Sequence, residues 1–110
     1  DEAFLNEITS IIDKHITNVD FSVDDLAQEI AMSRSNLYRK VKGLSGLTPN
    51  DFIRLVRLKK AVKLMQDGEN RINEICFMVG FNTSSYFAKC FKHQFGILPK
   101  DFVKGKITLD

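Results

Sequence analysis

The sequence is poor in the features that mark membrane spans, disulfide scaffolds and β-sheet proteins. Its 110 residues include no tryptophan, only two prolines and only two cysteines. It has no apolar run of the length that a transmembrane helix needs, and no basic segment followed by an apolar one, as in a signal peptide. Strand-like alternation and Asn-Gly or Asp-Gly hairpin turns are missing too. With 44% hydrophobic residues, we expect a folded all-α domain in the cytoplasm, without membrane contact.

Residues for catalysis or metal binding are also scarce. Neither Cys76 nor Cys90 has a second thiol or a histidine at metal-ligand spacing, and both lie in apolar stretches. We interpret them as small buried hydrophobic residues in a reducing compartment. His15 and His93 are isolated, so no nucleophile, base and orienting group come together. The sequence therefore predicts no enzyme, no catalytic residue, no metal site and no cofactor.

The charge is unevenly distributed, although its net value is only +2. Residues 1–31 hold eight acidic residues and one basic residue, whereas residues 32–110 hold six acidic and fifteen basic ones. The basic part is large enough to meet a polyanion, and the acidic start is expected to face away from it. A solvated basic surface without a ligand is the alternative.

Apolar residues recur at helical spacing along the whole chain, and caps divide them into about seven helices. Ser22 with Asp25 forms a capping box, Thr48 precedes Pro49, and Asn70 is placed to cap a later helix. Glycines at 46, 80 and 96 mark helix ends. The expected helices cover about 2–17, 23–30, 33–45, 49–67, 71–79 and 83–95, followed by a short helix from 99.

The stretch 22–53 is repeated at 71–103. The offset is 49 before a turn and 50 after it, as one inserted residue in the second turn would produce. The matched pairs include Val23 and Ile72, Leu26 and Ile75, Leu37 and Phe87, Val41 and Phe91, Gly46 and Gly96, Pro49 and Pro99, Phe52 and Phe102. We expect a first subdomain (1–48), a linker helix (49–67) of about 28 Å and a second subdomain (68–110).

Each copy has the form of a helix-turn-helix unit. A small residue within the first helix, Ala27 or Cys76, lets the second helix cross closely. Four places later the turn requires a residue that tolerates positive φ. Gly80 meets this requirement, whereas Ala31 departs from it. Two aligned copies with matching caps nevertheless predict two tandem helix-turn-helix subdomains.

The chain resembles the AraC/XylS transcription regulators over residues 5–104. The resemblance rests on the stretch from Gly80 to Lys92 with Phe95-Gly96 and Pro99, and on 32–37 in the first copy. Residues 23–27 and 33–40 are most similar to output domains at the end of hybrid two-component sensors, which are known for switching on glycan-utilisation genes. Ala31 and Leu98 depart from the pattern. The resemblance implies sequence-specific binding of double-stranded DNA by a transcription regulator.

Helical phase separates the core from the outer face of the two second helices. At 100° per residue, Leu37, Val41 and Leu44 form one buried stripe, and Phe87 and Phe91 form the other. The opposite faces, with two further basic residues, give the candidate DNA-binding residues. These are Arg34, Ser35, Tyr38, Arg39, Lys42, Arg71, Ser84, Ser85, Ala88, Lys89 and Lys92.

Arg39 is the first candidate for base recognition, because bidentate Arg to guanine is the commonest specific contact; a surface ion pair is the alternative. Lys89 is its less discriminating counterpart. Tyr38 is expected on a thymine methyl or a phosphate, or else partly packed.

The serines would donate to bases or phosphates, or else cap helices. Phosphate contacts are expected from Arg34, Lys42, Arg71 and Lys92. Five linker residues are left outside the site as solubilising charges: Arg54, Arg57, Lys59, Lys60 and Lys63.

Promoter or operator DNA is thus the expected partner, with RNA polymerase as a further candidate. Since no sensor or receiver segment accompanies these residues, we expect an excised output domain, from a full-length protein that dimerises through absent segments. The rival hypothesis is a helical module that docks its basic half on an acidic protein. An enzyme comes third.

Overall fold

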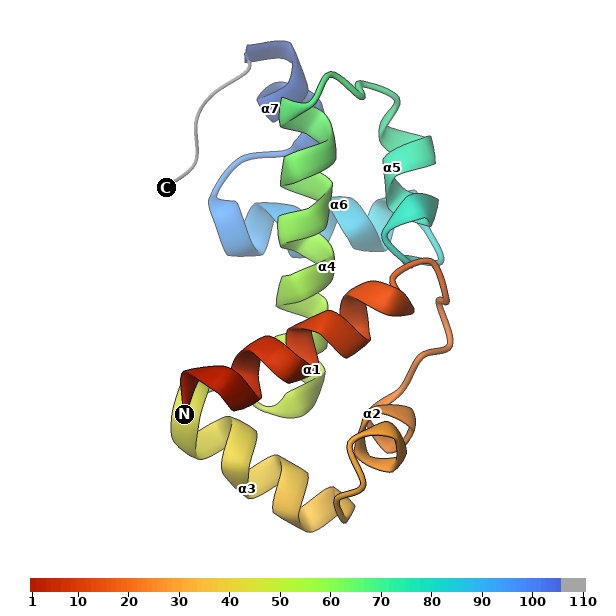
Figure 1. The fold of residues 1–110 in the computed structure, drawn as a ribbon. Coiled ribbons are helices and arrows are strands. Elements are labelled where there is room, and N and C mark those ends of the chain that lie inside the picture. The colour runs from red at the N-terminus through yellow and green to blue at the C-terminus, as the bar shows by residue number, and fades with distance from the viewer. Residues whose placement is uncertain (106–110) are drawn as a thin grey trace.

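The computed structural model describes residues 1–105, which form seven α-helices and no strand (Figure 1). The prediction of an all-α fold with about seven helices is confirmed. The end of the predicted second subdomain, 106–110, lies outside the described residues. The helices are α1 (Glu2–Lys14), α2 (Val23–Glu29), α3 (Arg34–Ser45), α4 (Pro49–Gln66), α5 (Ile72–Met78), α6 (Ser84–Phe95) and α7 (Pro99–Gly105).

The helix boundaries follow the predicted caps, with two exceptions. The Ser22–Asp25 capping box forms, and Thr48 caps α4 by accepting the backbone N–H of Asp51. However, α1 ends at Lys14 instead of residue 17, because the chain turns there and makes short-range turn bonds. Asn70 is not a cap: Arg71 takes that position without any side-chain cap bond.

The two helix-turn-helix turns begin in a similar way, with a residue at positive φ after the first helix. Ala31 has φ 58° and Gly80 has φ 85°. The next N–H in each turn donates back into the preceding helix, from Met32 to Ala27 and from Phe81 to Cys76, both at 2.9 Å. The first turn therefore forms as predicted, although alanine is strained in this left-handed region.

The units also match in length. α2 and α5 have seven residues each, and α3 and α6 have twelve. Both longer helices end on a glycine with φ 78°, Gly46 and Gly96. The repeat inferred from the sequence is thus present in the backbone.

Two hydrophobic cores lie along α4. The first lies between α1, α2, α3 and the start of α4 and contains Leu37; the second lies around α5, α6, α7 and the rest of α4 and contains Phe87 and Phe91. Leu37, Phe87 and Phe91 are fully buried, as predicted. Ile16 packs against both cores. Each subdomain therefore depends on the linker helix and on this shared contact.

Two predictions of burial are wrong. Leu44 is on the predicted stripe but 38% exposed, because helical phase fixes the face and not how far along it the neighbouring helices reach. Cys90 is only half-buried, at the side of α6 that faces α4. Cys76 is buried as predicted, and this burial raises the pKa of its thiol.

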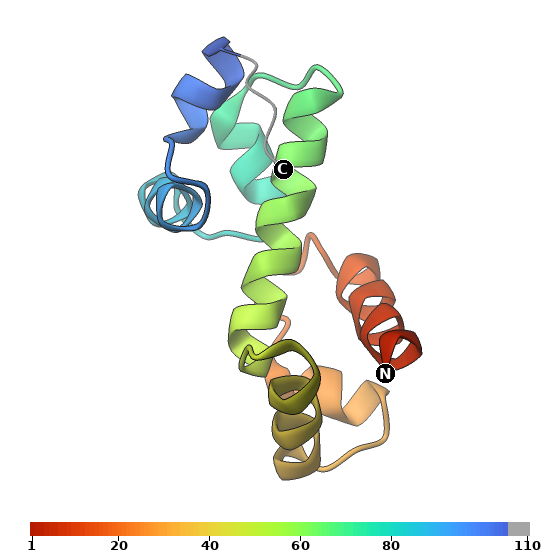
Figure 2. The same ribbon diagram turned by 90° about the vertical axis from the view of Figure 1, so that its left-hand side faces the viewer.

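α4 holds α3 and α6, the second helices of the two units, apart. Both α3 and α6 cross its direction and run the same way, with their N-terminal ends on the right in Figure 1. Figure 2 shows α1 and α6 on opposite sides of α4. The acidic first helix thus lies away from α6.

Candidate nucleic-acid interface

The outer face of α3 carries a cluster of exposed polar side chains near its start. Ser33 caps the helix by accepting the N–H of Asn36 at 3.1 Å, so the helix does not use Ser35 as its cap. Arg34, Ser35, Tyr38 and Arg39 line one shallow hollow in the surface. Tyr38 is 48% exposed, which leaves its ring available for a ligand.

The two arginines of this cluster differ in their partners. Arg39 donates to the side-chain oxygen of Asn36 on its own helix, and none of the ion pairs within residues 1–105 includes Arg39. The ion-pair alternative is therefore not seen. Arg34 pairs with Asp24 of α2 at 2.8 Å, and both side chains are exposed. An exposed pair of this kind is weak, so a phosphate can replace the carboxylate.

α6 presents a corresponding face with different chemistry. Thr83 is the cap, accepting the N–H of Tyr86 at 3.2 Å, so neither Ser84 nor Ser85 caps the helix. Ser84 is half-buried and donates to Asn73 of α5 at 2.6 Å, which ties the two helices together. Ser85, Lys89 and Lys92 are exposed, while Ala88 is half-buried.

Arg71 lies at the start of α5, at the opposite end of that helix from the turn into α6. Its side chain is held by Glu69, which accepts from Nε at 2.8 Å and from Nη2 at 3.1 Å. These bonds hold the pKa of Glu69 below its ordinary value and raise the pKa of Arg71. A phosphate at Arg71 would have to compete with this carboxylate.

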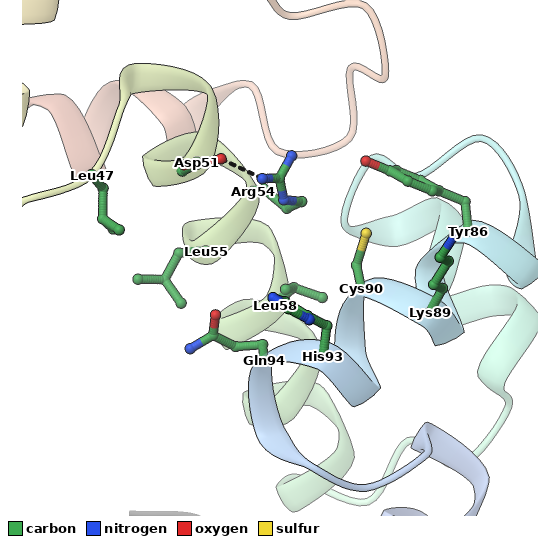
Figure 3. A pocket seen from close by; sticks show the side chains of 10 residues that line it. All are labelled: Leu47, Asp51, Arg54, Leu55, Leu58, Tyr86, Lys89, Cys90, His93 and Gln94. Atoms are coloured by element: carbon green, nitrogen blue, oxygen red, sulfur yellow. Dashed lines mark hydrogen bonds and ion pairs between the residues drawn. The ribbon is translucent and has the colours of Figure 1, made fainter.

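A groove of about 520 Å³ lies between the first half of α4 and the inner side of α6 (Figure 3). Lys89 lies at its edge, and Tyr86 and Arg54 face each other across it. Arg54 also pairs with Asp51. The sequence interpretation missed Tyr86 and Arg54 as neighbours of the candidate face. Tyr86 could have been found from its phase, three residues before Lys89, whereas Arg54 depends on how α6 packs.

The prediction for the linker charges is wrong at Arg57. Its side chain does not solubilise the helix: only 6% of the residue is exposed, and its guanidinium donates to three backbone carbonyls. The spread of basic residues around α4 gave no sign of this burial, which arises from α1 and α5 packing over one side of the helix.

Within residues 1–105 no three His, Cys, Asp or Glu side chains gather as metal ligands would. In the same range, none of the helices is both long and apolar enough to cross a bilayer. Ten of the eleven candidate residues lie in two patches, on α3 and α6, and Arg71 lies apart from them, at the cap position before α5.

Comparisons with known proteins point the same way. A family model described as a helix-turn-helix domain matches residues 26–105. Histidine kinase P4 of Formosa agariphila is 35% identical over 93% of this chain and 7% of its own length. The transcriptional activator RhaS of Klebsiella pneumoniae is 29% identical over 96% of this chain and 37% of its own length. The chain therefore spans only a minor part of these relatives.

The fold has a close counterpart among solved structures. A transcriptional regulator from Chromobacterium violaceum, described under AraC-type DNA-binding domain-containing proteins, superposes with a TM-score of 0.86. It is 26% identical, and the match covers 97% of this chain and 95% of that one. The two-unit architecture is thus shared along almost the whole length of both chains.

Proposed function

The chain belongs to the AraC-type helix-turn-helix family of DNA-binding transcription regulator domains, and on this premise we propose that α3 and α6 recognise double-stranded DNA in successive major-groove segments. The family and the fold are those of transcription regulators, not of enzymes. One observation carries the proposal: two equivalent helices run the same way on one linker and turn polar, basic faces outward.

The length of the linker fits this arrangement. The 18 residues of α4 span about 27 Å, against the 34 to 36 Å of one duplex turn. One monomer could therefore place both helices on the same side of the DNA. Because the outer faces differ, with Arg39 and Tyr38 on α3 against Lys89 and Ala88 on α6, the site need not be a palindrome. We expect an asymmetric element with two blocks about 10 base pairs apart.

The roles of the side chains follow from their positions. Arg39 is proposed to contact guanine, with Tyr38 and Ser35 beside it on α3. Ser85 and Lys89 of α6 would contact the second block. Ser84 and Ala88 would lie against the wall of the DNA major groove. Arg34, Lys42, Arg71 and Lys92 would contact phosphates, whose sequence-independent attraction falls as salt rises.

The experiment is a selection of bound sequences from random duplex, followed by insertion of five base pairs between the two selected blocks. The insertion turns the second block to the opposite side of the duplex. We expect a large loss of affinity and a footprint over one block only. Undiminished affinity with an intact footprint would contradict binding by a fixed pair. Failure to bind any duplex, with capture of acidic proteins instead, would favour the rival docking module.

We further propose that this domain is the output domain of a cytoplasmic two-component system that controls glycan-utilisation genes. The likeness to a protein named as a histidine kinase and the sequence resemblance described above support this proposal. RNA polymerase would be its second partner, and the full-length protein would act as a dimer. The proposed limits are 1–48, 49–67 and 68–110. Transcript profiling after deletion of the domain tests this: unchanged glycan-utilisation transcripts would contradict it.

A further inference from the structure

Arg57 lies at the middle of α4, where the two subdomains meet. Among the buried residues within 1–105, Arg57 is the one with a charged side chain, and only 6% of its surface is exposed. Its Nη1 donates to the carbonyl of Ile16 at 2.6 Å and to that of Val79 at 2.8 Å. Its Nη2 donates to the carbonyl of Asn18 at 2.9 Å. One guanidinium therefore joins the segment after α1 to the residue that ends α5.

The partners of this guanidinium are neutral. None of the ion pairs within residues 1–105 includes Arg57. Burying a charge without a counter-ion is costly unless its hydrogen-bonding groups are satisfied, and the removal of water lowers the pKa of the guanidinium. The planar fork of arginine can bond carbonyls on different segments at once, which the single ammonium of lysine cannot match in geometry.

The neighbouring turn is built around this side chain. A β-carbon at residue 80 would overlap the Arg57 guanidinium and crowd the carbonyl of Ile16. Glycine at position 80 therefore avoids the strain of a side chain at φ 85° and leaves the space that Arg57 occupies. The corresponding turn residue of the first unit, Ala31, is exposed and meets no such constraint.

We propose that Arg57 is a positioning residue, which fixes the second helix-turn-helix unit relative to the first and so sets the spacing between DNA blocks that the domain accepts. The inference rests on the proposed function. Apart from α4 itself, the hydrophobic contact common to both cores is Ile16, whose carbonyl Arg57 also binds. Without the guanidinium, α5 and α6 would keep their own core but lose a fixed bond to the first subdomain.

The first test uses Arg57→Met, which keeps most of the side-chain volume but has no donors, and Lys59→Met as the control. Lys59 is exposed on the same helix, so the control removes the same charge. Affinity is measured for single blocks and for two blocks with spacers changed by one or two base pairs. For Arg57→Met we expect unchanged single-block affinity, an about tenfold loss of the two-block advantage and a broader spacer profile. An unchanged spacer profile would overturn the inference.

The second test does not depend on DNA. Spin labels at Leu44→Cys and Gln94→Cys, which are equivalent positions near the ends of α3 and α6, report the distance between the helices in a Cys90→Ser background. Cys76 is fully buried and can stay. We expect one narrow distance distribution with Arg57 and a broader or displaced one with Met. Identical distributions would overturn the inference.

The two tests separate the two proposals. If the unsubstituted protein binds no duplex, the proposed function fails, while the distance distribution still decides the role of Arg57. If Arg57→Met does not fold, as judged by its thermal melt, Arg57→Lys is used and read in the same way. That substitution keeps the charge and the stem but not the planar fork.

Discussion

The two helix-turn-helix units share one backbone plan but are filled differently. The first core is mainly aliphatic around α3, with Leu37 and Val41 buried. At the matching places the second core has Phe87 and Phe91, which join Phe81, Phe95 and Phe102 in a chain of ring contacts. The plan is therefore fixed by caps, turn and apolar spacing, while the side chains on both faces are free to diverge.

The two turns differ in whether they tolerate a side chain at the residue with positive φ. Ala31 adopts φ 58° at the surface, so the first turn tolerates a side chain at the cost of backbone strain. Gly80 is buried beneath Arg57, so a side chain there would collide as well as strain. The same motif position thus has a local role in one unit and a role between subdomains in the other.

The largest expected effects come from the two cores. Leu37→Ala should lower the free energy of unfolding by about 2 to 5 kcal/mol and Phe87→Ala by about 3 to 5 kcal/mol, since each leaves a cavity in a fully buried site. Because α4 and Ile16 are common to both cores, we expect each variant to melt in one transition. Arg39→Ala is the surface control, within about 0.5 kcal/mol. Two separate transitions would show that the units unfold independently.

Much of this comparison could be predicted from the sequence. The matched pairs at offsets 49 and 50, the Ser22–Asp25 capping box and the glycine ends act locally, so spacing alone located both units. Arg57 could not be predicted, because its burial is created by Ile16, Asn18 and Val79, which come from distant parts of the chain. The prediction for Leu44 was wrong for a similar reason: its helical phase is right, but the neighbouring helices leave 38% of its surface exposed.

The next effect concerns DNA recognition by the two faces. Arg39→Ala should weaken binding to the selected site by about 1 to 3 kcal/mol and relax the preference at one base pair. Lys89→Ala should relax the base preference in the second block less, because the ammonium of lysine is a point charge. Titrations on selected and single-substituted duplexes measure both. Equal losses on specific and random duplex for Arg39→Ala would contradict its role in base recognition.

Lys92 serves as the matched comparison for a phosphate contact. Lys92→Ala should weaken binding to all DNA sequences alike. It should also reduce the slope of log affinity against log salt concentration by about one unit. Binding isotherms over a series of salt concentrations give this slope. A change in base preference with an unaltered salt slope would show that Lys92 contacts a base and not a phosphate.

A smaller effect is expected from making the two turns identical. Ala31→Gly removes a strained left-handed alanine but adds freedom to the unfolded chain, so we expect a net gain of up to about 1 kcal/mol. The reverse change, Gly80→Ala, should destabilise the protein by more than that gain, because of the overlap with Arg57. Chemical denaturation compares the two. Equal and opposite changes would mean that Arg57 adds no constraint at Gly80.

The smallest effect is a pH dependence of the ion pairs between α1 and α2 in the first unit. Glu29 of α2 bonds Lys14 and His15 at the end of α1, whereas the matching residue of the second unit is Met78. The bond with Lys14, and then that with His15, hold the pKa of Glu29 below its ordinary value. The folded state thus binds the Glu29 proton more weakly than the unfolded state does. The resulting stability is present above the unfolded pKa, about 4.3, and is lost as the pH falls through the folded pKa.

Glu29→Gln should therefore be slightly less stable than the unsubstituted protein at pH 7, and the difference should vanish towards low pH. Glu7→Gln is the matched control, because Glu7 is exposed on α1 and forms no ion pair within residues 1–105. Melting temperatures measured from pH 7 downwards give the comparison. A difference for Glu29→Gln that persists unchanged at low pH would show that the carboxylate charge of Glu29 is not the source of that difference in stability.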